Sequence, residues 1–184
     1  MIPAADPGDL SLISPSPHFE HAFTEMAAEF AADGEPRYLG GAADFGEFLR
    51  RTSDSAAGRN LPPGFVAESH FWLVQGDVIV GNSRLRHVLN PKLDHEGGHV
   101  GYDIRPSCRR RGFGTVLLRL TLERAAALGI VRARLTCDSH NVGSIRIIES
   151  NGGVLDGEGI SHYSGKPIRQ FWVPVPGGSN APRP

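Results

Sequence analysis

Cysteine, lysine and long apolar runs are scarce in this chain of 184 residues. Its two cysteines, Cys108 and Cys137, are too few for a disulfide scaffold, and their spacing matches no thiolate zinc knuckle. No apolar run approaches the roughly 18 residues that a membrane-spanning helix needs. The start of the chain, Met1 to Leu10, lacks the basic and apolar regions of a signal peptide. These absences predict a cytoplasmic protein with reduced thiols and no membrane partner.

An excess of one charge sign is also absent, because 19 basic side chains stand against 20 acidic ones and the net charge is −1. A broad positive field for nucleic acid is therefore not expected, and we predict no nucleic-acid partner. Hydrophobic residues make up 40% and charged residues 21%, as in folded soluble proteins. The basic residues other than Lys92 and Lys166 are all arginines, a bias that suits local anion recognition.

The length predicts a single domain over residues 1–184, with flexible Pro- and Gly-rich tails at 1–8 and 176–184. Apolar spacing and capping patterns indicate helices, and alternating or β-branched runs indicate strands, so that the fold class is α+β with a βαβ unit in the middle. In the helix of that unit we expect Leu128 on the buried side, and in the strand that follows it we expect Arg134 on the solvent-exposed side. The expected helices cover 16–34, 44–57, 113–128 and 142–150, and the expected strands cover 71–74, 78–88, 99–104, 131–138, 154–155 and 168–173.

The most informative segment runs from Arg109 to Gly114 and lies between an expected strand and an expected helix. Free backbone N–H groups at a helix N-terminus favour an anion such as a diphosphate, and glycine lets it approach the backbone. The segment is no P-loop, since no Gly-Lys-Ser/Thr follows, and no dinucleotide fingerprint, since Leu117 stands where the third glycine belongs. Taken alone, it fits an anion site or a simple glycine turn with solvated arginines.

This segment resembles motif A of the GNAT superfamily of acyl-CoA-dependent N-acetyltransferases, whose pattern is Q/R-x-x-G-x-G/A. The likeness continues from His99 to Val154, where Asn141, Ser144, Glu149 and Gly152 follow the family's N-x-x-A-x-x-L-Y-E-x-x-G. The resemblance implies a GNAT-like mixed, mainly antiparallel twisted sheet with flanking helices and a central βαβ unit that binds acyl-CoA. It also implies acetyl-CoA as co-substrate, no metal, and an amine acceptor as the partner substrate.

The resemblance also implies a set of cofactor-binding residues. The strand that begins at His99 would splay from the strand that ends at Asp138, which exposes backbone groups of Tyr102 and Ile104 to the pantetheine arm. The diphosphate would lie on the amides of residues 110–115, and the Asn141 side chain would bond the pantetheine. The full expected set is Tyr102, Asp103, Ile104, Arg109, Arg110, Arg111, Gly112, Phe113, Gly114, Thr115, Asn141 and Ser144.

The acid and the base depart from the family. An ammonium acceptor must lose a proton before it attacks a thioester. Some members use a Glu five positions before the Asn and a Tyr seven positions after it, but Thr136 and Ile148 stand there. The expected catalytic residues are His99, Tyr102 and Asp138, with Tyr102 as acid and His99 as base near its usual pKa. Asp103, His140 or a water chain are the other candidates for the base, and each of these side chains could instead serve a structural role.

Two other functions and one assembly stay open at this stage. The missing Tyr at Ile148 allows a GNAT-like domain that holds acyl-CoA without transfer. His95-Glu96-Gly97-Gly98-His99 is a literal H-E-x-x-H zinc-peptidase motif, but two adjacent glycines disfavour the helix that this motif needs. Apolar strands near Phe71 and Trp172 would serve either a core or the interface of a homodimer.

Overall fold

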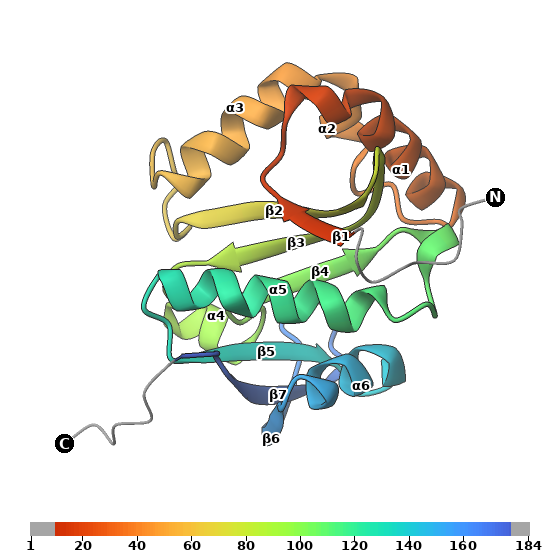
Figure 1. The fold of residues 1–184 in the computed structure, drawn as a ribbon. Helices are drawn as coiled ribbons and strands as arrows, with labels where there is room; N and C mark the ends of the chain where they lie inside the picture. The colour runs from red at the N-terminus through yellow and green to blue at the C-terminus, as the bar shows by residue number, and fades with distance from the viewer. Residues whose placement is uncertain (1–9, 178–184) are drawn as a thin grey trace.

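The computed structural model describes residues 10–177, with two antiparallel sheets and their flanking helices (Figure 1). The predicted tail at 1–8, and the predicted tail at 176–184 from residue 178 onward, lie outside the described residues, and the single domain stays a prediction. The N-terminal elements are β1 (Leu10–Ile13), the 3₁₀ turn η2 (Pro17–Phe19), α1 (Glu20–Ala32), α2 (Leu39–Ala43) and α3 (Phe45–Ala56). They are followed by β2 (Glu68–Gln75), β3 (Val78–Arg86), α4 (Pro91–His95), β4 (Val100–Ile104), η3 (Pro106–Cys108), α5 (Phe113–Ala127), β5 (Arg132–Asp138), α6 (Val142–Ser150), β6 (Val154–Ile160) and β7 (Pro167–Pro174).

The strands form two sheets that meet between β4 and β5. The first sheet has the order β1-β2-β3-β4 and the second the order β5-β7-β6, and the pairs within both are antiparallel. The unit β4-α5-β5 connects them, and β4 and β5 run in the same direction (Figure 1). The predicted α+β class with mainly antiparallel pairing is confirmed. What the fold adds is that β4 and β5, the parallel pair, do not form a ladder.

The two faces of the first sheet carry two separate cores. Figure 1 shows α1, α2 and α3 above this sheet and α5 on its other side. Under α1 and α3, Trp72 of β2 is fully buried among aromatic rings, with the ring of Phe23 at 5.4 Å and that of Phe48 at 6.2 Å. The second core lies around α5, where Leu117 and Leu118 are fully buried and pack toward both sheets. The site described below lies where these two cores leave the edge of β4 uncovered.

The helical pattern of α1 follows its sequence, because Phe23, Met26 and Phe30 recur at helical spacing and are buried. Asp44 accepts a hydrogen bond from the Glu47 N–H at 3.0 Å and caps α3, as the spacing of these residues predicts. None of the helices within residues 10–177 is long and apolar enough to span a bilayer.

Two side chains lie on the opposite side to the one expected. Leu128 is 44% exposed, because it follows the last turn of α5. Arg134 is only 6% exposed, although strand alternation predicts a wet position. Its guanidinium donates to the Asp94 carbonyl at 3.1 Å, bonds the Asp156 carboxylate and lies over the Trp172 ring. Arg134 therefore ties α4 and β6 to β5 as a buried, ion-paired cation.

Candidate active site

The gap between β4 and β5 is closed at one end and open at the other. At the closed end, the His99 N–H donates to the Arg134 carbonyl at 2.7 Å. Beyond it, β4 pairs only with β3 and β5 only with β7. His99 O and Arg105 N bond to β3, so alternation along an antiparallel strand turns the backbone groups of Tyr102 and Ile104 toward the gap. This matches the predicted splay and exposes a row of backbone donors and acceptors.

The open end meets a turn with unpaired N–H groups. Arg110 and Gly112 adopt left-handed backbone conformations, with φ of 60° and 83°. The N–H groups of Gly112, Phe113 and Gly114 make no hydrogen bond to any residue in the range 10–177, whereas Thr115 N already bonds Gly112 O. Unpaired N–H groups at the start of a helix, together with the helix dipole, favour an anion. The turn therefore presents donors that a diphosphate would need.

The two motif glycines have different reasons to be glycine. A Cβ on Gly112 would meet nothing within 4 Å, so its positive φ is the constraint. Gly114 is buried, and a Cβ there would collide with Ile147 of α6. Gly114 thus allows α5 and α6 to pack closely.

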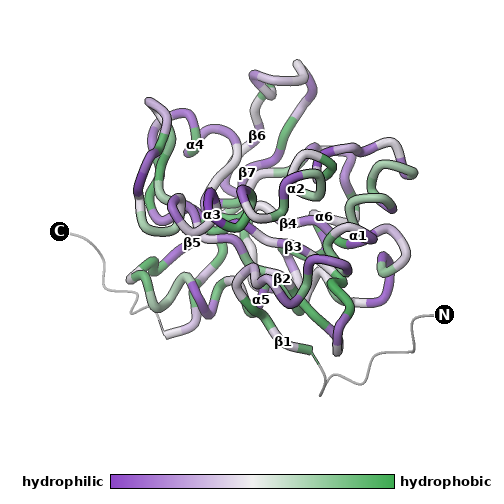
Figure 2. The backbone as a smooth tube through the Cα atoms, turned by 90° about the horizontal axis from the view of Figure 1, so that it is seen from above, coloured by the Kyte–Doolittle hydropathy of each residue, from purple (hydrophilic) through white to green (hydrophobic). Residues whose placement is uncertain are grey.

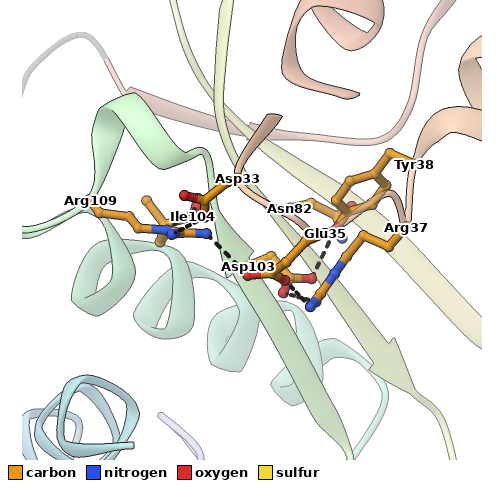
Figure 3. A network of polar contacts seen from close by, with 8 residues as sticks. All are labelled: Asp33, Glu35, Arg37, Tyr38, Asn82, Asp103, Ile104 and Arg109. Atoms are coloured by element: carbon orange, nitrogen blue, oxygen red, sulfur yellow. Dashed lines mark hydrogen bonds and ion pairs between the residues drawn. The ribbon is translucent and has the colours of Figure 1, made fainter. Parts of the chain in front are cut away.

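The three arginines of the motif segment also differ in where their side chains lie. Arg109 points away from the turn: its guanidinium pairs with Asp33, approaches Glu35 at 3.5 Å and donates to the Ile104 carbonyl (Figure 3). Arg110 is exposed on the turn, and the Arg111 guanidinium lies 5.0 Å from the centre of the Phe113 ring. The side chain of Arg109 therefore anchors the turn to the segment after α1.

Asn141 and Ser144 lie at the start of α6, beside the gap. The Asn141 Oδ1 caps α6 by accepting from the Ser144 N–H at 2.9 Å. Its Nδ2 makes no hydrogen bond within the described part of the chain, so two donors stay available. The Ser144 hydroxyl bonds the Tyr102 hydroxyl at 2.8 Å, which joins β4 to α6. The structure thus brings Tyr102, Asn141 and Ser144 together.

The three expected catalytic residues do not form one cluster. His99 lies at the closed end opposite Arg134, Tyr102 in the middle of β4, and Asp138 at the last position of β5. Asp138 comes four positions after Arg134, which is about 13 Å of strand. The Asp138 carboxylate accepts from the His140 N–H at 2.8 Å and orders the turn that follows. Burial raises the pKa of Tyr102, so its hydroxyl stays protonated.

The geometry of His99 disfavours its predicted role as a base. Its Nδ1 accepts a hydrogen bond from the Arg134 N–H at 2.9 Å, which uses the lone pair and places the proton on Nε2. Burial lowers the pKa of His99 to about 4. A ring held neutral with its acceptor nitrogen engaged is suited to fixing strand register. The assignment of His99 as base stays a prediction without support from these contacts.

The H-E-x-x-H segment does not form the helix of a zinc peptidase. α4 ends at His95, and Gly97 and Gly98 both have positive φ. His95 bonds the Ile160 carbonyl, and Glu96 accepts from the Ser161 hydroxyl and the His162 N–H. The motif residues are therefore spread over contacts with the β6–β7 connection.

Asp103 heads a polar network that sequence analysis did not foresee. Its carboxylate pairs with Arg37 and accepts from the Tyr38 hydroxyl at 2.7 Å, and Asn82 donates to that hydroxyl at 3.2 Å (Figure 3). Burial and the Asp103 charge raise the pKa of Tyr38. Arg37 and Tyr38 belong to the segment before α2, where the sequence carries no motif. Asn82 could have been found only from the register of β3 with β4, which places it opposite Asp103. Asp103 thus faces α1 and α2, on the opposite side of β4 from α5.

Beside this network an open cavity of about 640 Å³ lies under α3. Its lining includes Phe48 of α3, Phe65 of the following loop, and Glu68 and His70 of β2. Glu68 pairs with His70 and with Arg86, both at 3.1 Å. Together these contacts hold the pKa of Glu68 below its usual range, although burial opposes this. The cavity opens on the same face of the sheet as Asp103.

Three solved structures illustrate what this fold resembles. They are RimJ of Mycobacterium smegmatis in complex with CoA-disulfide (TM-score 0.69, 14% identity, 90% of this chain and 82% of that one), ribosomal-protein-S5-alanine acetyltransferase from Vibrio fischeri (0.65, 11%, 93% and 96%), and the microcin C7 self-immunity acetyltransferase MccE in complex with acetyl-CoA and AMP (0.67, 12%, 91% and 93%). These likenesses concern the fold.

Comparison with curated protein sequences finds no match. The family model described as acetyltransferase (GNAT) domain matches residues 17–154. This range is most of the chain and contains the splayed strands and the turn at the start of α5. The fold, the geometry of the gap and this match agree, and the chain belongs to the GNAT acetyltransferase domain family.

Proposed function

We propose that this protein acetylates a primary amine, with acetyl-CoA as the acyl donor. The observation that carries the proposal is the continuity of two backbone surfaces: the free N–H groups of the turn and the edge of β4 that pairs with no strand among the described residues. The free N–H groups of Gly112, Phe113 and Gly114 lie at the end of the β4 edge that presents Tyr102 and Ile104. A ligand with a diphosphate at one end and an amide-rich arm at the other matches this order of donors and acceptors.

The chain's own groups fit acetyl-CoA without a metal ligand set. The Arg110–Gly112 turn would hold the diphosphate, the β4 edge would pair with the pantetheine amides, and the free Asn141 Nδ2 would donate to a pantetheine carbonyl. MccE in complex with acetyl-CoA and RimJ in complex with CoA-disulfide, which share the fold, support this placement.

Acetyl-CoA supplies an activated acyl thioester. Backbone N–H groups on the β4 edge would stabilise negative charge on the thioester oxygen. The amine nitrogen forms the new C–N bond, the C–S bond breaks, and the amine gives up one proton. The Tyr102 hydroxyl, kept protonated by its raised pKa, is the group we assign to protonate the departing sulfur. For the base, Asp138 and His99 stay predictions, and Asp103 lies on the face from which an acceptor would approach.

The test combines binding with turnover. Calorimetry with acetyl-CoA and CoA should show binding at a single site, and release of CoA thiol should follow when primary amines are added. A folded sample that binds neither ligand would remove the proposal.

Binding without thiol release on a broad amine panel would favour the alternative, a domain that holds acyl-CoA without transfer. Ile148, which stands where some family members carry Tyr, is fully buried and keeps this alternative open.

A further inference from the structure

Arg84 of β3 differs in its surroundings from the other arginines of the sheet. Arg86 pairs with Glu68 and donates to the carbonyls of Gly97 and Gly98, and Arg105 pairs with Glu29. Arg84 is half-buried, yet it makes no hydrogen bond or ion pair with any residue in the range 10–177. Five N–H donors on a partly desolvated guanidinium are costly to leave without a partner.

The nearby acids are already engaged. The Glu68 carboxylate contacts Arg86 and His70, and the Asp103 carboxylate contacts Arg37 and Tyr38. Arg84 acts on Glu68 and on Tyr38 only through longer-range electrostatics. The fold therefore places a cation here without providing its counter-ion.

The position of Arg84 is set by sheet register. His70, Arg84 and Gly101 are cross-strand neighbours on β2, β3 and β4. The next row contains Asn82 and Asp103, and the pleat puts both rows on the face toward α1–α3. Arg84 thus lies on the face of β4 opposite α5, where an acceptor can approach a thioester held at the β4 edge.

Gly101 makes room for the guanidinium. A Cβ on Gly101 would lie 3.2 Å from the Arg84 Nη2, tighter than ordinary packing. The guanidinium therefore lies over β4 at Gly101. A bulkier residue at position 101 would displace it.

An open cavity lies near the row that contains Arg84, and the β6–β7 connection lies near Arg86. The open cavity under α3 reaches the same row through His70. Tyr163, in the β6–β7 connection, lies close enough to Arg86 to act on it electrostatically. That connection is held to α4 by the stacked rings of His95 and His162 and by Lys92, whose ammonium lies 4.9 Å from the centre of the Tyr163 ring. Seen from above, it extends from the same side of the molecule as α4 (Figure 2).

We infer that Arg84 binds an anionic group of the acceptor, so that the substrate is a primary amine that carries a carboxylate or a phosphate near the amine. The inference rests on the proposed function. The planar guanidinium suits two parallel hydrogen bonds to either anion. Its place beside the β4 edge would orient the amine of the same molecule toward the gap.

The test uses the full chain, acetyl-CoA and paired acceptors with and without the anion: L-phenylalanine and phenethylamine, L-leucine and isoamylamine, O-phosphoethanolamine and ethanolamine. Thiol release should give a kcat/KM at least tenfold higher for the anionic member of a pair. The amino-acid and phosphate arms distinguish a carboxylate from a phosphate.

The Arg84→Gln variant should abolish this preference by raising KM for the anionic acceptor at least tenfold. It should leave kcat/KM for the amine without the anion, and the Kd for acetyl-CoA, within about twofold. Arg84→Lys should retain part of the preference. Arg119→Gln, which removes an exposed arginine of α5 paired with Glu123, is the matched control and should behave as wild type.

Equal use of both members of each pair would overturn the inference, as would an Arg84→Gln variant that keeps the preference or loses both members equally. Turnover of phenethylamine, isoamylamine or ethanolamine alone would also overturn it, while the proposed function stands. Failure to bind acetyl-CoA would remove the proposed function itself. So would the absence of thiol release with every amine of both series. Melting temperatures confirm that each variant is folded.

Discussion

The two ends of the β4–β5 gap differ in how the backbone is satisfied. At the closed end, the N–H of His99 and the N–H of Arg134 both have partners, and the buried Arg134 guanidinium bonds Asp94 and Asp156. At the open end, the turn before α5 leaves consecutive N–H groups without a partner among the described residues. The closed end fixes how β4 and β5 lie relative to each other. The open end leaves backbone N–H donors available to a ligand. Substitutions at the two ends should therefore affect different measurements.

The largest effect is expected from Gly98→Val at the closed end. Gly98 has a φ of 62°, and a Cβ there would collide with the Arg134 carbonyl oxygen. Backbone strain and overpacking together should lower the free energy of unfolding by about 2–4 kcal/mol. Urea denaturation measures this change. Gly76→Ala, with a φ of 55° and no neighbour within 4 Å of its Cβ, is the control and should cost only the strain.

The second effect concerns the open end. Gly112→Ala should distort the turn because only its positive φ requires glycine, and it should weaken acetyl-CoA binding at least tenfold, about 1.4 kcal/mol. Gly129→Ala introduces a similar strain after the other end of α5, where φ is 74° and the space is open. Calorimetry should show unchanged affinity in that control. Equal loss in both variants would mean that the turn does not bind the ligand.

A third comparison separates the two functions of the Asn141 amide. Asn141→Ala removes the cap of α6 and should cost about 1 kcal/mol of stability, whereas Asn141→Asp keeps an oxygen acceptor for the Ser144 N–H. Both remove the Nδ2 donors, so both should raise KM for acetyl-CoA more than KM for the amine. If Asn141→Asp binds acetyl-CoA as wild type does, Asn141 is a cap alone.

The smallest effect is a pH dependence at the closed end. The folded state holds the pKa of His99 at about 4, below its usual 6.5, so the unfolded chain binds the proton more readily. Its stabilising contribution is therefore complete above pH 6.5 and is lost as pH falls toward 4. His99→Asn should reduce the loss of stability between pH 7 and pH 5, a range above the titration of the carboxylates whose pKa is lowered. Thiol release across the same range should follow wild type unless His99 is the base.

Sequence alone located the parts of the site whose chemistry is local. The turn at Gly112 and the helix that starts after Asn141 depend on residues within a few positions of each other, and the structure has both a turn and a helix start at these positions. The segment Leu39–Ala43 was missed because its composition, with adjacent glycines, has low helix propensity and its helix depends on packing against α1 and α3. β1 was missed because four residues give too short an alternation to stand out.

Long-range pairing explains what the sequence could not show. Asp103 stays a predicted cofactor-binding residue, and the structure adds that its carboxylate meets Arg37 and Tyr38, more than 60 positions earlier in the chain. Gly114 stays a predicted part of the diphosphate turn, and the structure adds that a Cβ there would collide with Ile147 of α6. Periodicity gives the face of an element that is buried, but it does not say which distant segment packs against that face.

The contact between Lys92 and Tyr163 has a practical consequence for labelling. The chain has few primary amines of its own, although we propose that it acetylates a primary amine. Lys92 in α4 and Lys166 just before β7 are its only lysines, and both are exposed beside the β6–β7 connection. Apart from the α-amino group, an amine-directed label can therefore react only with these two lysines, and it reports on the surface around the β6–β7 connection. Protection of Lys92, with Lys166 as the internal reference, would show by footprinting whether an acceptor binds near the contact of Lys92 with Tyr163.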